Sequence, residues 1–459
     1  MPELPEVETV INILKPLVVG KTISKLEVYY DRLIQSDLDT FKNEILGKSI
    51  KDISRYGKYI YIHLSNDLVI ITHLRMEGKF RFLEENKRIK ATSAMFFFKD
   101  GTFLSFDDTR KFGLMYLTTE QELSSVPMIS KLGIEANKVT KKDMPYLYEA
   151  FNKNKPIKEL LLDQTILCGI GNIYADEICY ATKINPYTKG KDLLKEQIDE
   201  IAKQAKVILN KAIELGGSTI HSFHPSEGVD GKFQEVLMCY GREGENCPLC
   251  GTRFHKTFLS GRGTTYCPNC QIDKTLEKAI GITGPIASGK STALNYLKER
   301  GYRVYSADDI VHELYRKPNI QRKVSNIIKA PFDIDNKEIT LRARKLLIAF
   351  PERNIQLQNY IHPLVEEEFL KILKDDDCPV FEVPLLFKAH YEYMFKKILV
   401  ISISKEQQLK NLNNRGENIE TSKKLNFDFV YPKDHPKIKI VQATGDFKSF
   451  YQNIDKALD

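Results

Sequence analysis

The first ten residues, MPELPEVETV, combine a nucleophile and an acid that could act on a sugar carbon. Met1 precedes a small residue, so an aminopeptidase can remove it and leave Pro2 as the amino terminus. A terminal secondary amine has a pKa near ~8, so part of it is unprotonated and nucleophilic at neutral pH. Its attack on a sugar carbon gives an iminium, and the carboxyl group of Glu3 is suited to proton transfer. The alternative is an ordinary helix start, where proline and acidic residues are common.

Four of the eight cysteines form two Cys-x-x-Cys pairs, separated by sixteen residues. In a cytosolic chain this spacing indicates a metal site and is typical of a tetrahedral zinc ribbon. Four thiolates leave no open coordination position, so the zinc would be structural and would support the basic segment between the pairs. The predicted ligands are Cys247, Cys250, Cys267 and Cys270.

A phosphate-binding motif follows the apolar run AIGITG. The residues GPIASGKST have the P-loop spacing Gly284-x4-Gly289-Lys290-Ser291, between a predicted strand and a predicted helix. Backbone N–H groups would cradle phosphates, Lys290 would reach the β- and γ-phosphates, and Ser291 would bind Mg²⁺. We therefore expect ATP and Mg²⁺ as cofactors. The predicted loop contacts are Gly284, Pro285, Ile286, Ala287, Ser288, Gly289, Lys290, Ser291 and Thr292.

The length of 459 residues predicts two to four domains, and 28% charged with 42% hydrophobic residues is a soluble composition. The start has no apolar core run and no stretch approaches a membrane span, so we expect a cytoplasmic protein with no membrane partner. A monomer is a separate expectation. The net charge of +7 is uneven: residues 1–275 hold 38 Lys and Arg against 36 Asp and Glu (+2), and the remainder holds 30 against 25 (+5). Basic groups that bind DNA must therefore be placed locally.

The first 130 residues are predicted to be β-rich. Residues 5–17 have helical spacing, and Asp100-Gly101 is a two-residue hairpin signal between two strands. The β-patterned runs are LEVYY, YIYIHL, LVIITHL, AMFFFKD and TFLSFDD.

The pattern becomes helical from about residue 141. A helix is predicted over 192–215, ended by Gly216 and Gly217. Before it, the glycine-rich turn in DQTILCGIGNIYADEI opens another helix and offers backbone N–H groups to a phosphate; the alternative is a simple connecting turn. Residues 216–236 are polar and glycine-rich, and are long enough for a mobile loop over a site.

Residues 1 to about 272 resemble the bacterial formamidopyrimidine-DNA glycosylases, which excise oxidised purines. The matching segments are PELPEVETV, YGKYIYIHL, THLRMEGKF, DDTRKFG, DQTILCGIGNIYADE, GGSTIHSF, DGKFQEVLMCYGREGENCPLCG and GRGTTYCPNCQ. The resemblance implies that Pro2 attacks C1′ of a damaged nucleotide such as 8-oxoguanine or a formamidopyrimidine, with Glu3 as general acid/base. It adds Lys58 to the catalytic set. Strand cleavage through the iminium would follow, so the expected enzyme is a glycosylase and AP lyase that acts on damaged double-stranded DNA.

The resemblance also implies a DNA-binding set. Its members are Glu6, His73, Met76, Arg110, Phe112, Lys158, Asn172, Tyr240 and Arg262. Met76, Arg110 and Phe112 would fill the gap left by an extruded nucleotide. Lys58, His73, Asn172, Tyr240 and Arg262 would hold phosphates, Glu6 would support the site, and residues 222–235 would form a lid over the extruded base.

One departure concerns the loop before Arg110. The family usually has Asn-Asp-Pro there, and this chain has Asp107-Asp108-Thr109. An alternative for the substrate comes from the related endonuclease VIII-like enzymes, which share the Pro-Glu start and favour oxidised pyrimidines.

Residues 279–459 resemble dephospho-CoA kinase, through GITGPIASGKST, SADDIV, IHPLV, VPLLF and QLKNLNNR. The resemblance implies dephospho-CoA as a partner, Asp308 as the base that activates the ribose 3′-hydroxyl, and Arg415 as an ATP-binding lid arginine. It places His362 in the acceptor region. The departures are Pro285, Ser306, Glu382 and Ala443 in place of Gly, Asp, Asp and Asn. The alternative is a non-catalytic nucleotide-binding module.

The chain is thus predicted to be a multidomain protein, α+β followed by α/β with a parallel sheet covered by helices on both faces. We expect a fusion of two enzymes that work independently. The predicted domains are a β-rich catalytic domain (1–130), a helical DNA-binding domain with a lid loop (131–236), a zinc finger (237–272) and a P-loop kinase-like domain (279–459).

Overall fold

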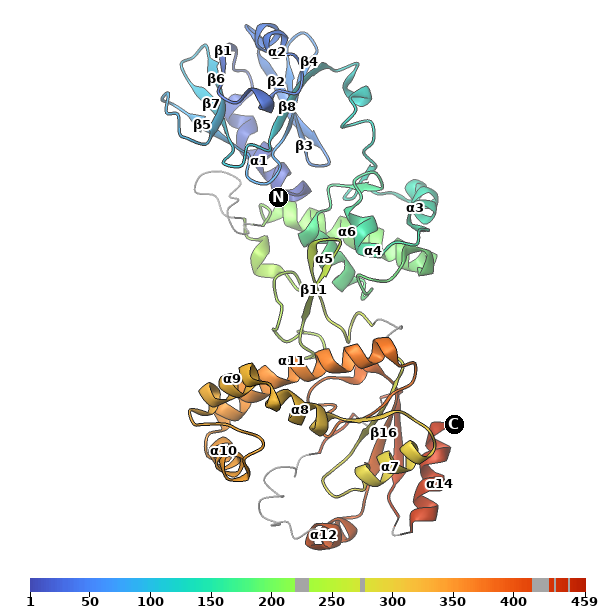
Figure 1. Cartoon of the computed structure of the whole chain (residues 1–459). Coiled ribbons are helices and arrows are strands. Elements are labelled where there is room, and N and C mark those ends of the chain that lie inside the picture. The colour runs from blue at the N-terminus through green and yellow to red at the C-terminus, as the bar shows by residue number, and fades with distance from the viewer. Residues whose placement is uncertain (219–230, 273–276, 415–428, 433–434, 445) are drawn as a thin grey trace. The chain divides into compact units, whose positions relative to one another are not determined.

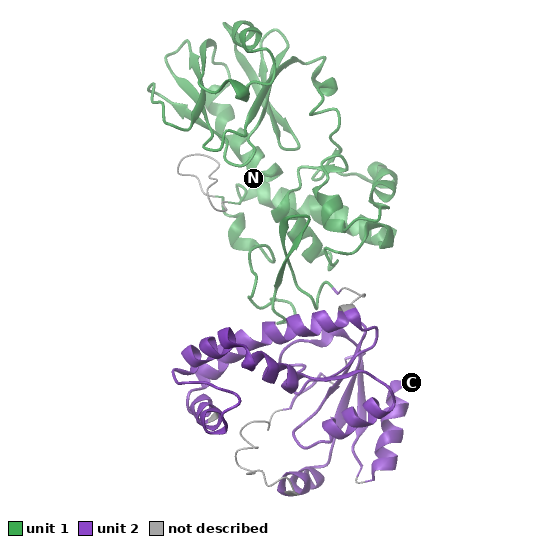
Figure 2. Cartoon of the chain, in the orientation of Figure 1, with its two compact units in different colours: residues 1–271 green, residues 272–459 purple. Residues whose placement is uncertain are grey.

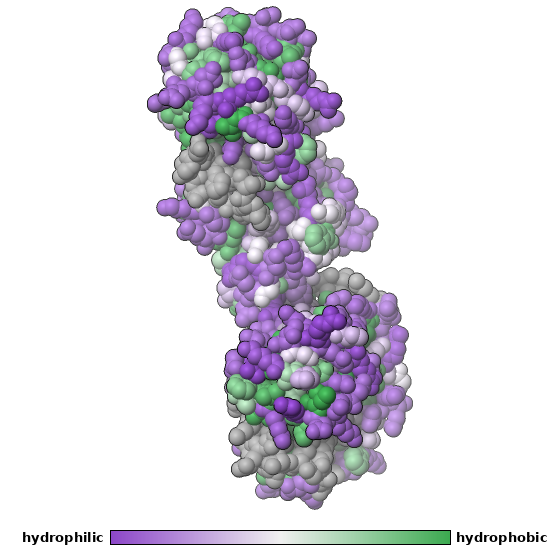
Figure 3. All heavy atoms as spheres, turned by 60° about the vertical axis from the view of Figure 1, so that its left-hand side comes forward, coloured by the Kyte–Doolittle hydropathy of each residue, from purple (hydrophilic) through white to green (hydrophobic). Residues whose placement is uncertain are grey.

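The computed structural model describes residues 1–218, 231–272, 277–414, 429–432, 435–444 and 446–459. The chain forms two compact units, Met1–Gln271 and Ile272–Asp459 (Figures 1 and 2). Most of the predicted lid and the predicted lid arginine at position 415 lie outside the described residues. No helix in the described part of the chain is long and apolar enough to cross a membrane, and hydrophilic side chains dominate the face shown in Figure 3.

The first unit begins with helix α1, Leu4–Val18, which confirms the helix predicted over 5–17. Pro5 lies in its first turn, and the Glu3 N–H donates to Glu6 at 2.9 Å. Two four-stranded antiparallel sheets follow, in the orders β1-β6-β7-β5 and β2-β3-β4-β8, and the apolar face of α1 shares one core with both. The elements are β1 (Ile23–Val28), α2 (Leu38–Ile45), β2 (Ile50–Tyr56), β3 (Tyr59–Leu64), β4 (Leu68–His73), β5 (Lys79–Leu83), β6 (Thr92–Phe98), β7 (Phe103–Asp107) and β8 (Leu114–Thr119).

The helical part of this unit has its own core, formed mainly by the helices α3 to α6. The predicted helix 192–215 is α6, and Gly216 and Gly217 end it with positive φ angles of 76° and 75°. A short hairpin, β11–β12, follows between the two cysteine pairs. The elements are β9 (Ile134–Glu135), α3 (Met144–Phe151), α4 (Ile157–Leu162), β10 (Leu167–Cys168), α5 (Asn172–Ala181), α6 (Lys195–Glu214), β11 (His255–Leu259) and β12 (Arg262–Tyr266).

The second unit is built on a five-stranded parallel sheet in the order β14-β15-β13-β16-β17. Alternating residues of the strands pack into two hydrophobic cores, one with helices α8 to α11 and one with α7 and α14. Helices therefore cover both faces of the sheet, as predicted (Figure 1). The elements are β13 (Ala279–Thr283), α7 (Lys290–Glu299), β14 (Val304–Ser306), α8 (Ala307–Arg316), α9 (Pro318–Ile328), α10 (Lys337–Ala349), α11 (Pro351–Asp375), β15 (Val380–Glu382), β16 (Phe395–Ser402), α12 (Lys405–Asn414), β17 (Ile438–Gln442) and α14 (Phe447–Leu458).

Candidate functional sites

The carboxyl group of Glu3 lies at the amino end of α5. It accepts hydrogen bonds from the Gly171 N–H at 2.5 Å and the Ile173 N–H at 2.9 Å, and its side chain is 2% exposed. Glycine suits positions 169 and 171: Gly169 has a φ angle of 102°, and a Cβ atom would come within 2.5 Å of the Leu4 side chain at 169 and 2.3 Å of the Glu3 side chain at 171. The prediction of a phosphate at this turn is therefore wrong for these two N–H groups, which bind an internal carboxylate.

Glu6 joins three segments of the first unit. Its Oε1 atom accepts hydrogen bonds from the Tyr174 hydroxyl at 2.7 Å and from the Ser218 N–H and hydroxyl at 2.8 and 2.9 Å. The other oxygen accepts the Glu3 N–H. Glu6 is buried and fully engaged, so it supports the site from within and does not reach DNA itself.

Lys58 is the cationic partner of Glu3. Its ammonium is buried and donates to the Ile170 carbonyl at 2.7 Å. Burial raises the pKa of Glu3 to about 7, and the charge of Lys58 opposes this rise. Burial likewise lowers the pKa of Lys58, against the effect of Glu3. The pair therefore holds a carboxyl group that can exchange a proton near neutral pH.

The amino terminus lies close to this pair. Met1 is exposed, and Pro2 is buried behind it. Burial lowers the pKa of the terminal amine, while Glu3 and Glu6 raise it. Removal of Met1 would place the Pro2 amine beside an acid with a pKa of about 7.

A groove of about 550 Å³ opens next to the amino terminus. Met76 and Phe112 are 39% and 55% exposed, and both line the groove. The Arg110 guanidinium lies 5.0 Å from the Phe112 ring. The structure therefore brings together the three residues predicted to fill the gap in a duplex. The groove lining is Met1, Arg32, Gln35, Arg75, Met76, Lys111, Phe112, Gly113 and Leu114.

Asp108 fixes the shape of the loop that carries Arg110 and Phe112. Its buried carboxylate accepts the N–H groups of Arg110, Phe112 and Gly113 at 2.9, 2.8 and 2.7 Å. Thr109, the residue in place of the usual proline, donates its hydroxyl to Glu77. The departure at 107–109 thus leaves a loop that is held by its own hydrogen bonds.

Replacing Asp108 by alanine should weaken duplex binding and base excision by roughly 10- to 100-fold, because three loop N–H groups lose their acceptor. Single-turnover excision and DNA affinity would be measured together. Asp31→Ala, an exposed aspartate in the same unit, is the control. Unchanged excision by Asp108→Ala would show that the loop needs no such support.

His73 ends β4 and is 6% exposed. Burial lowers its pKa to about 3, so the imidazole is neutral at physiological pH. Its Nδ1 atom lies 2.9 Å from the Arg75 N–H and therefore accepts, which leaves the proton on Nε2. The ring is set to act as a neutral hydrogen-bond donor.

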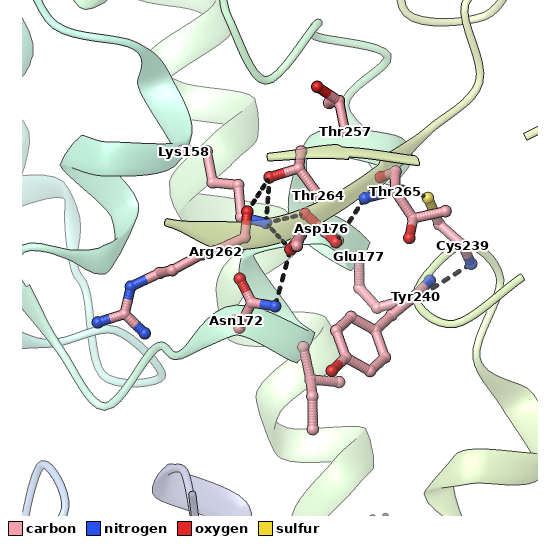
Figure 4. Close-up of polar contacts among 12 residues, drawn as sticks. Lys158, Asn172, Asp176, Glu177, Cys239, Tyr240, Thr257, Arg262, Thr264 and Thr265 are labelled. Atoms are coloured by element: carbon pink, nitrogen blue, oxygen red, sulfur yellow. Dashed lines mark hydrogen bonds and ion pairs between the residues drawn. The ribbon is translucent and has the colours of Figure 1, made fainter. Parts of the chain in front are cut away.

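The β11–β12 hairpin is anchored to α4 and α5 by buried polar contacts (Figure 4). The Lys158 ammonium, fully buried, pairs with Asp176 at 2.6 Å and donates to the Gly263 carbonyl and the Thr264 hydroxyl, both at 2.9 Å. Asn172 donates to the same Gly263 carbonyl at 2.9 Å. Burial raises the pKa of Asp176 to about 6. The Asp176 carboxylate also accepts a hydrogen bond from the Thr265 N–H.

This anchor changes the role expected for Lys158. Its side chain does not reach the surface, so the structure does not support direct contact between Lys158 and DNA. It instead positions Arg262, which is exposed and precedes Gly263; Figure 4 shows the Arg262 guanidinium extending away from the anchor. Tyr240 is half-buried and lies on a turn whose N–H groups bind Glu177.

Sequence reasoning missed the buried acids that hold the site: Asp108, Asp176 and Glu177. The signal for two of them was their place in α5, where acidic residues interrupt an otherwise apolar stretch. Buried acids need partners, and here the partners are backbone N–H groups and one lysine.

The four predicted metal ligands converge. One sulfur atom from each of Cys247, Cys250, Cys267 and Cys270 lies within 4.8 Å of the others, which fits tetrahedral thiolate coordination. These residues would hold the structural zinc. The zinc would fix the base of the hairpin that carries Arg262.

The second unit brings its predicted phosphate residues to the carboxyl edge of the sheet. The P-loop joins β13 to α7. Ser306 ends β14 and Glu382 ends β15, and the two residues are paired in register. Ser306 caps α8 by accepting the Asp309 N–H at 3.4 Å, which gives a structural reason for serine there. Asp308 is exposed beside it.

The loop carries the lysine and the hydroxyl groups expected of a site for ATP and Mg²⁺. The Lys290 ammonium bonds to the Gly284 and Pro285 carbonyls at 3.1 and 3.0 Å, within the loop that would receive the phosphates. The Ser288 hydroxyl is buried and has no hydrogen-bond partner among the described residues. Burial raises the pKa of Glu382, and the charge of Lys290 opposes this rise.

Comparison with known proteins covers both units. Residues 1–115 match the formamidopyrimidine-DNA glycosylase N-terminal domain, 132–224 its H2TH domain, and 244–272 the zinc finger found in FPG and IleRS. A formamidopyrimidine-DNA glycosylase from Lactobacillus helveticus is 44% identical over 274 residues, which cover 59% of this chain and 99% of that protein. The chain belongs to the formamidopyrimidine-DNA glycosylase family. The glycosylase from Bacillus cereus is similar at 43% identity over 276 residues, with the same coverage.

Solved structures agree with this membership of the formamidopyrimidine-DNA glycosylase family. A Lactococcus lactis FPG mutant bound to Fapy-dG containing DNA has a TM-score of 0.56 and 38% identity, and covers 59% of this chain and 99% of that chain. The Lactococcus lactis Fpg bound to abasic site containing DNA gives a TM-score of 0.55 with the same identity and coverage. Residues 278–426 match dephospho-CoA kinase. The predicted fusion of a glycosylase with a kinase domain is confirmed.

Proposed function

We propose that the glycosylase unit excises oxidised purines, namely 8-oxoguanine and formamidopyrimidines, from double-stranded DNA through a covalent intermediate on Pro2. The observation that carries this proposal is the buried Glu3, with a pKa of about 7, beside the amino terminus. It supplies a proton donor next to an amine at the pH where the enzyme would work.

The reaction begins after Met1 has been removed. The Pro2 nitrogen attacks C1′, the C1′–N bond to the damaged base breaks, and the base leaves with the proton that the Pro2 nitrogen loses. Glu3 then donates a proton to O4′ as the C1′–O4′ bond breaks, and the nitrogen lone pair forms an iminium between Pro2 and C1′. The iminium makes the C2′ proton acidic, so its loss and elimination of the 3′-phosphate cleave the strand.

The duplex would be held on both sides of this site. Met76, Arg110 and Phe112 enter the gap left by the extruded nucleotide. Neutral His73 donates to a phosphate, and Asn172, Tyr240 and Arg262 hold the backbone from the α5 and hairpin side. Lys58 tunes Glu3 from its buried position and belongs to the catalytic group.

Replacing Pro2 by glycine should remove most of the protein–DNA adduct that borohydride traps, since the secondary amine of the proposed iminium is lost. The measurement is the yield of trapped adduct on a duplex with one 8-oxoguanine opposite cytosine. Pro16→Gly, at the other end of α1, is the control for loss of a proline. A Pro2→Gly protein that still gives the adduct in full yield would contradict the mechanism.

The substrate class needs a separate test, because one similar Lactococcus lactis structure contains an oxidized pyrimidine in its DNA. Wild-type protein would be given matched duplexes with 8-oxoguanine, a formamidopyrimidine or an oxidised pyrimidine. We expect single-turnover excision of both purine lesions to be faster. Faster excision of the pyrimidine would favour the endonuclease VIII-like alternative.

For the second unit we propose transfer of the ATP γ-phosphoryl group to the ribose 3′-hydroxyl of dephospho-CoA. Asp308 accepts the hydroxyl proton and Lys290 contacts the transferred group. The resemblance adds Arg415, which lies outside the described residues, as an ATP-binding arginine. The supporting observation is the convergence of the P-loop, Asp308 and Glu382 at one edge of the sheet. CoA formation from dephospho-CoA and MgATP tests this directly; nucleotide binding without CoA formation would indicate a non-catalytic module.

A further inference from the structure

The P-loop contains a backbone conformation that its own residues do not favour. Ala287 has a φ angle of 57°, in the left-handed region that disfavours residues with a Cβ atom. Two residues earlier, Pro285 has no N–H group and a fixed φ. Contacts from outside the loop can offset the cost of this conformation at Ala287.

Side chains of α12 contact the loop at this point. The Gln408 side-chain amide donates to the Ile286 carbonyl at 2.9 Å, and the Asn411 amide donates to the Ala287 carbonyl at 3.0 Å. Gln407 donates to the Asn411 side-chain oxygen at 3.0 Å, which orients that amide. These residues lie three and four positions apart, so they share one face of the helix.

Two carbonyl groups bound from α12 determine where the following N–H groups point. A peptide unit is planar and trans, so its N–H is directed opposite to its C=O. The N–H of Ala287 therefore points away from α12. The N–H of Ser288 points into the loop, where it lies 3.3 Å from the Pro285 carbonyl.

We propose that Gln408 and Asn411 are positioning residues that hold the P-loop in its phosphate-binding shape, in place of the backbone freedom that glycine at 287 would supply. This inference rests on the ATP site proposed above. Asn414 is the last described residue of α12, and the predicted lid arginine, Arg415, follows it directly in the sequence.

The test is calorimetric titration of the full-length protein with MgADP, beside steady-state kinetics with MgATP. Asn411→Ala, and Asn411→Asp, which cannot donate, should each weaken MgADP binding about tenfold. They should raise KM for ATP by a similar factor with little change in kcat, because a binding contact is lost. Asn413→Ala, an exposed amide on the same helix, is the matched control and should bind as wild type.

A second substitution separates loop shape from general stability. Introducing Ala287→Gly into the Asn411→Ala protein should restore most of the affinity, because glycine adopts the left-handed conformation unaided. Gln408→Glu removes the neighbouring donor and gives an independent test in a protein that keeps Asn411. Three results would overturn this inference and leave the ATP site standing. They are wild-type affinity in the Asn411 and Gln408 variants, an equal loss of affinity in Asn413→Ala, and no recovery of affinity with Ala287→Gly. Failure of the wild-type protein to bind MgADP would overturn the ATP site and this inference with it.

Discussion

Replacing Glu3 by glutamine is expected to slow excision of an oxidised purine by roughly 100- to 10,000-fold, the range for loss of a general acid or base. Glutamine keeps the shape of the side chain but cannot exchange a proton. It also cannot accept from both the Gly171 and Ile173 N–H groups. Cleavage of a preformed abasic site should be less affected, since its aldehyde is already open to attack by the amine.

The pH dependence of this variant provides a second readout. Burial raises the pKa of Glu3 from its usual 4.5 to about 7, so the folded protein retains a proton that the unfolded chain releases. The contribution of Glu3 to the free energy of unfolding should therefore fall as pH rises from 4.5 to about 7. Excision by the wild type should likewise fall above pH 7, as the acid form is lost.

Both pH effects should be missing in Glu3→Gln. Glu44→Gln, an exposed glutamate on α2, is the matched control and should behave as wild type. Single-turnover excision and thermal unfolding would be followed over the same pH range. Wild-type excision by Glu3→Gln would remove Glu3 from the mechanism.

Replacing Lys290 by alanine is expected to reduce CoA formation by roughly 100- to 1,000-fold, the range for loss of one donor to the charge that develops in a transition state. Lys290 opens α7 at the P-loop, and its ammonium lies within the loop. Phosphoryl transfer depends mainly on positioning and electrostatics, so loss of this positive charge should act mainly on the transfer step.

The measurement is turnover of dephospho-CoA and MgATP by the full-length protein. Lys298→Ala, an exposed lysine in the last turn of α7, is the control. Excision of damaged bases by Lys290→Ala should equal that of the wild type if the two enzymes work independently. Full CoA formation by Lys290→Ala would contradict the assignment of the P-loop.

Local chemistry in the sequence predicted much of the fold. Helix α1, five strands of the first unit (β1, β3, β4, β6 and β7), the cysteine cluster and the strand before the P-loop follow from periodicity and spacing. Strands β2, β5 and β8 were not singled out, because their half-exposed residues weaken the alternating pattern.

The contacts between distant residues could not be predicted in this way. A glycine-rich turn before a helix is compatible with a phosphate, and only the fold shows that Glu3, 168 residues earlier, takes its N–H groups. Likewise, a lysine at position 158 suggests a surface cation, and only the packing of the hairpin on α4 and α5 reveals its partners. Similarly, the Asn411 side chain that binds the P-loop lies 124 residues after Ala287 in the sequence.

The central claim is that the amine of Pro2, freed by removal of Met1, is the nucleophile of the glycosylase unit. The most direct test is mass spectrometry of the borohydride-trapped complex, digested to locate the residue that carries the sugar. Lys58 is the competing amine, because it is buried beside Glu3 and has a lowered pKa. We predict that the adduct is on a peptide that begins at Pro2 and lacks Met1. An adduct on Lys58, or on a peptide that retains Met1, would contradict this account.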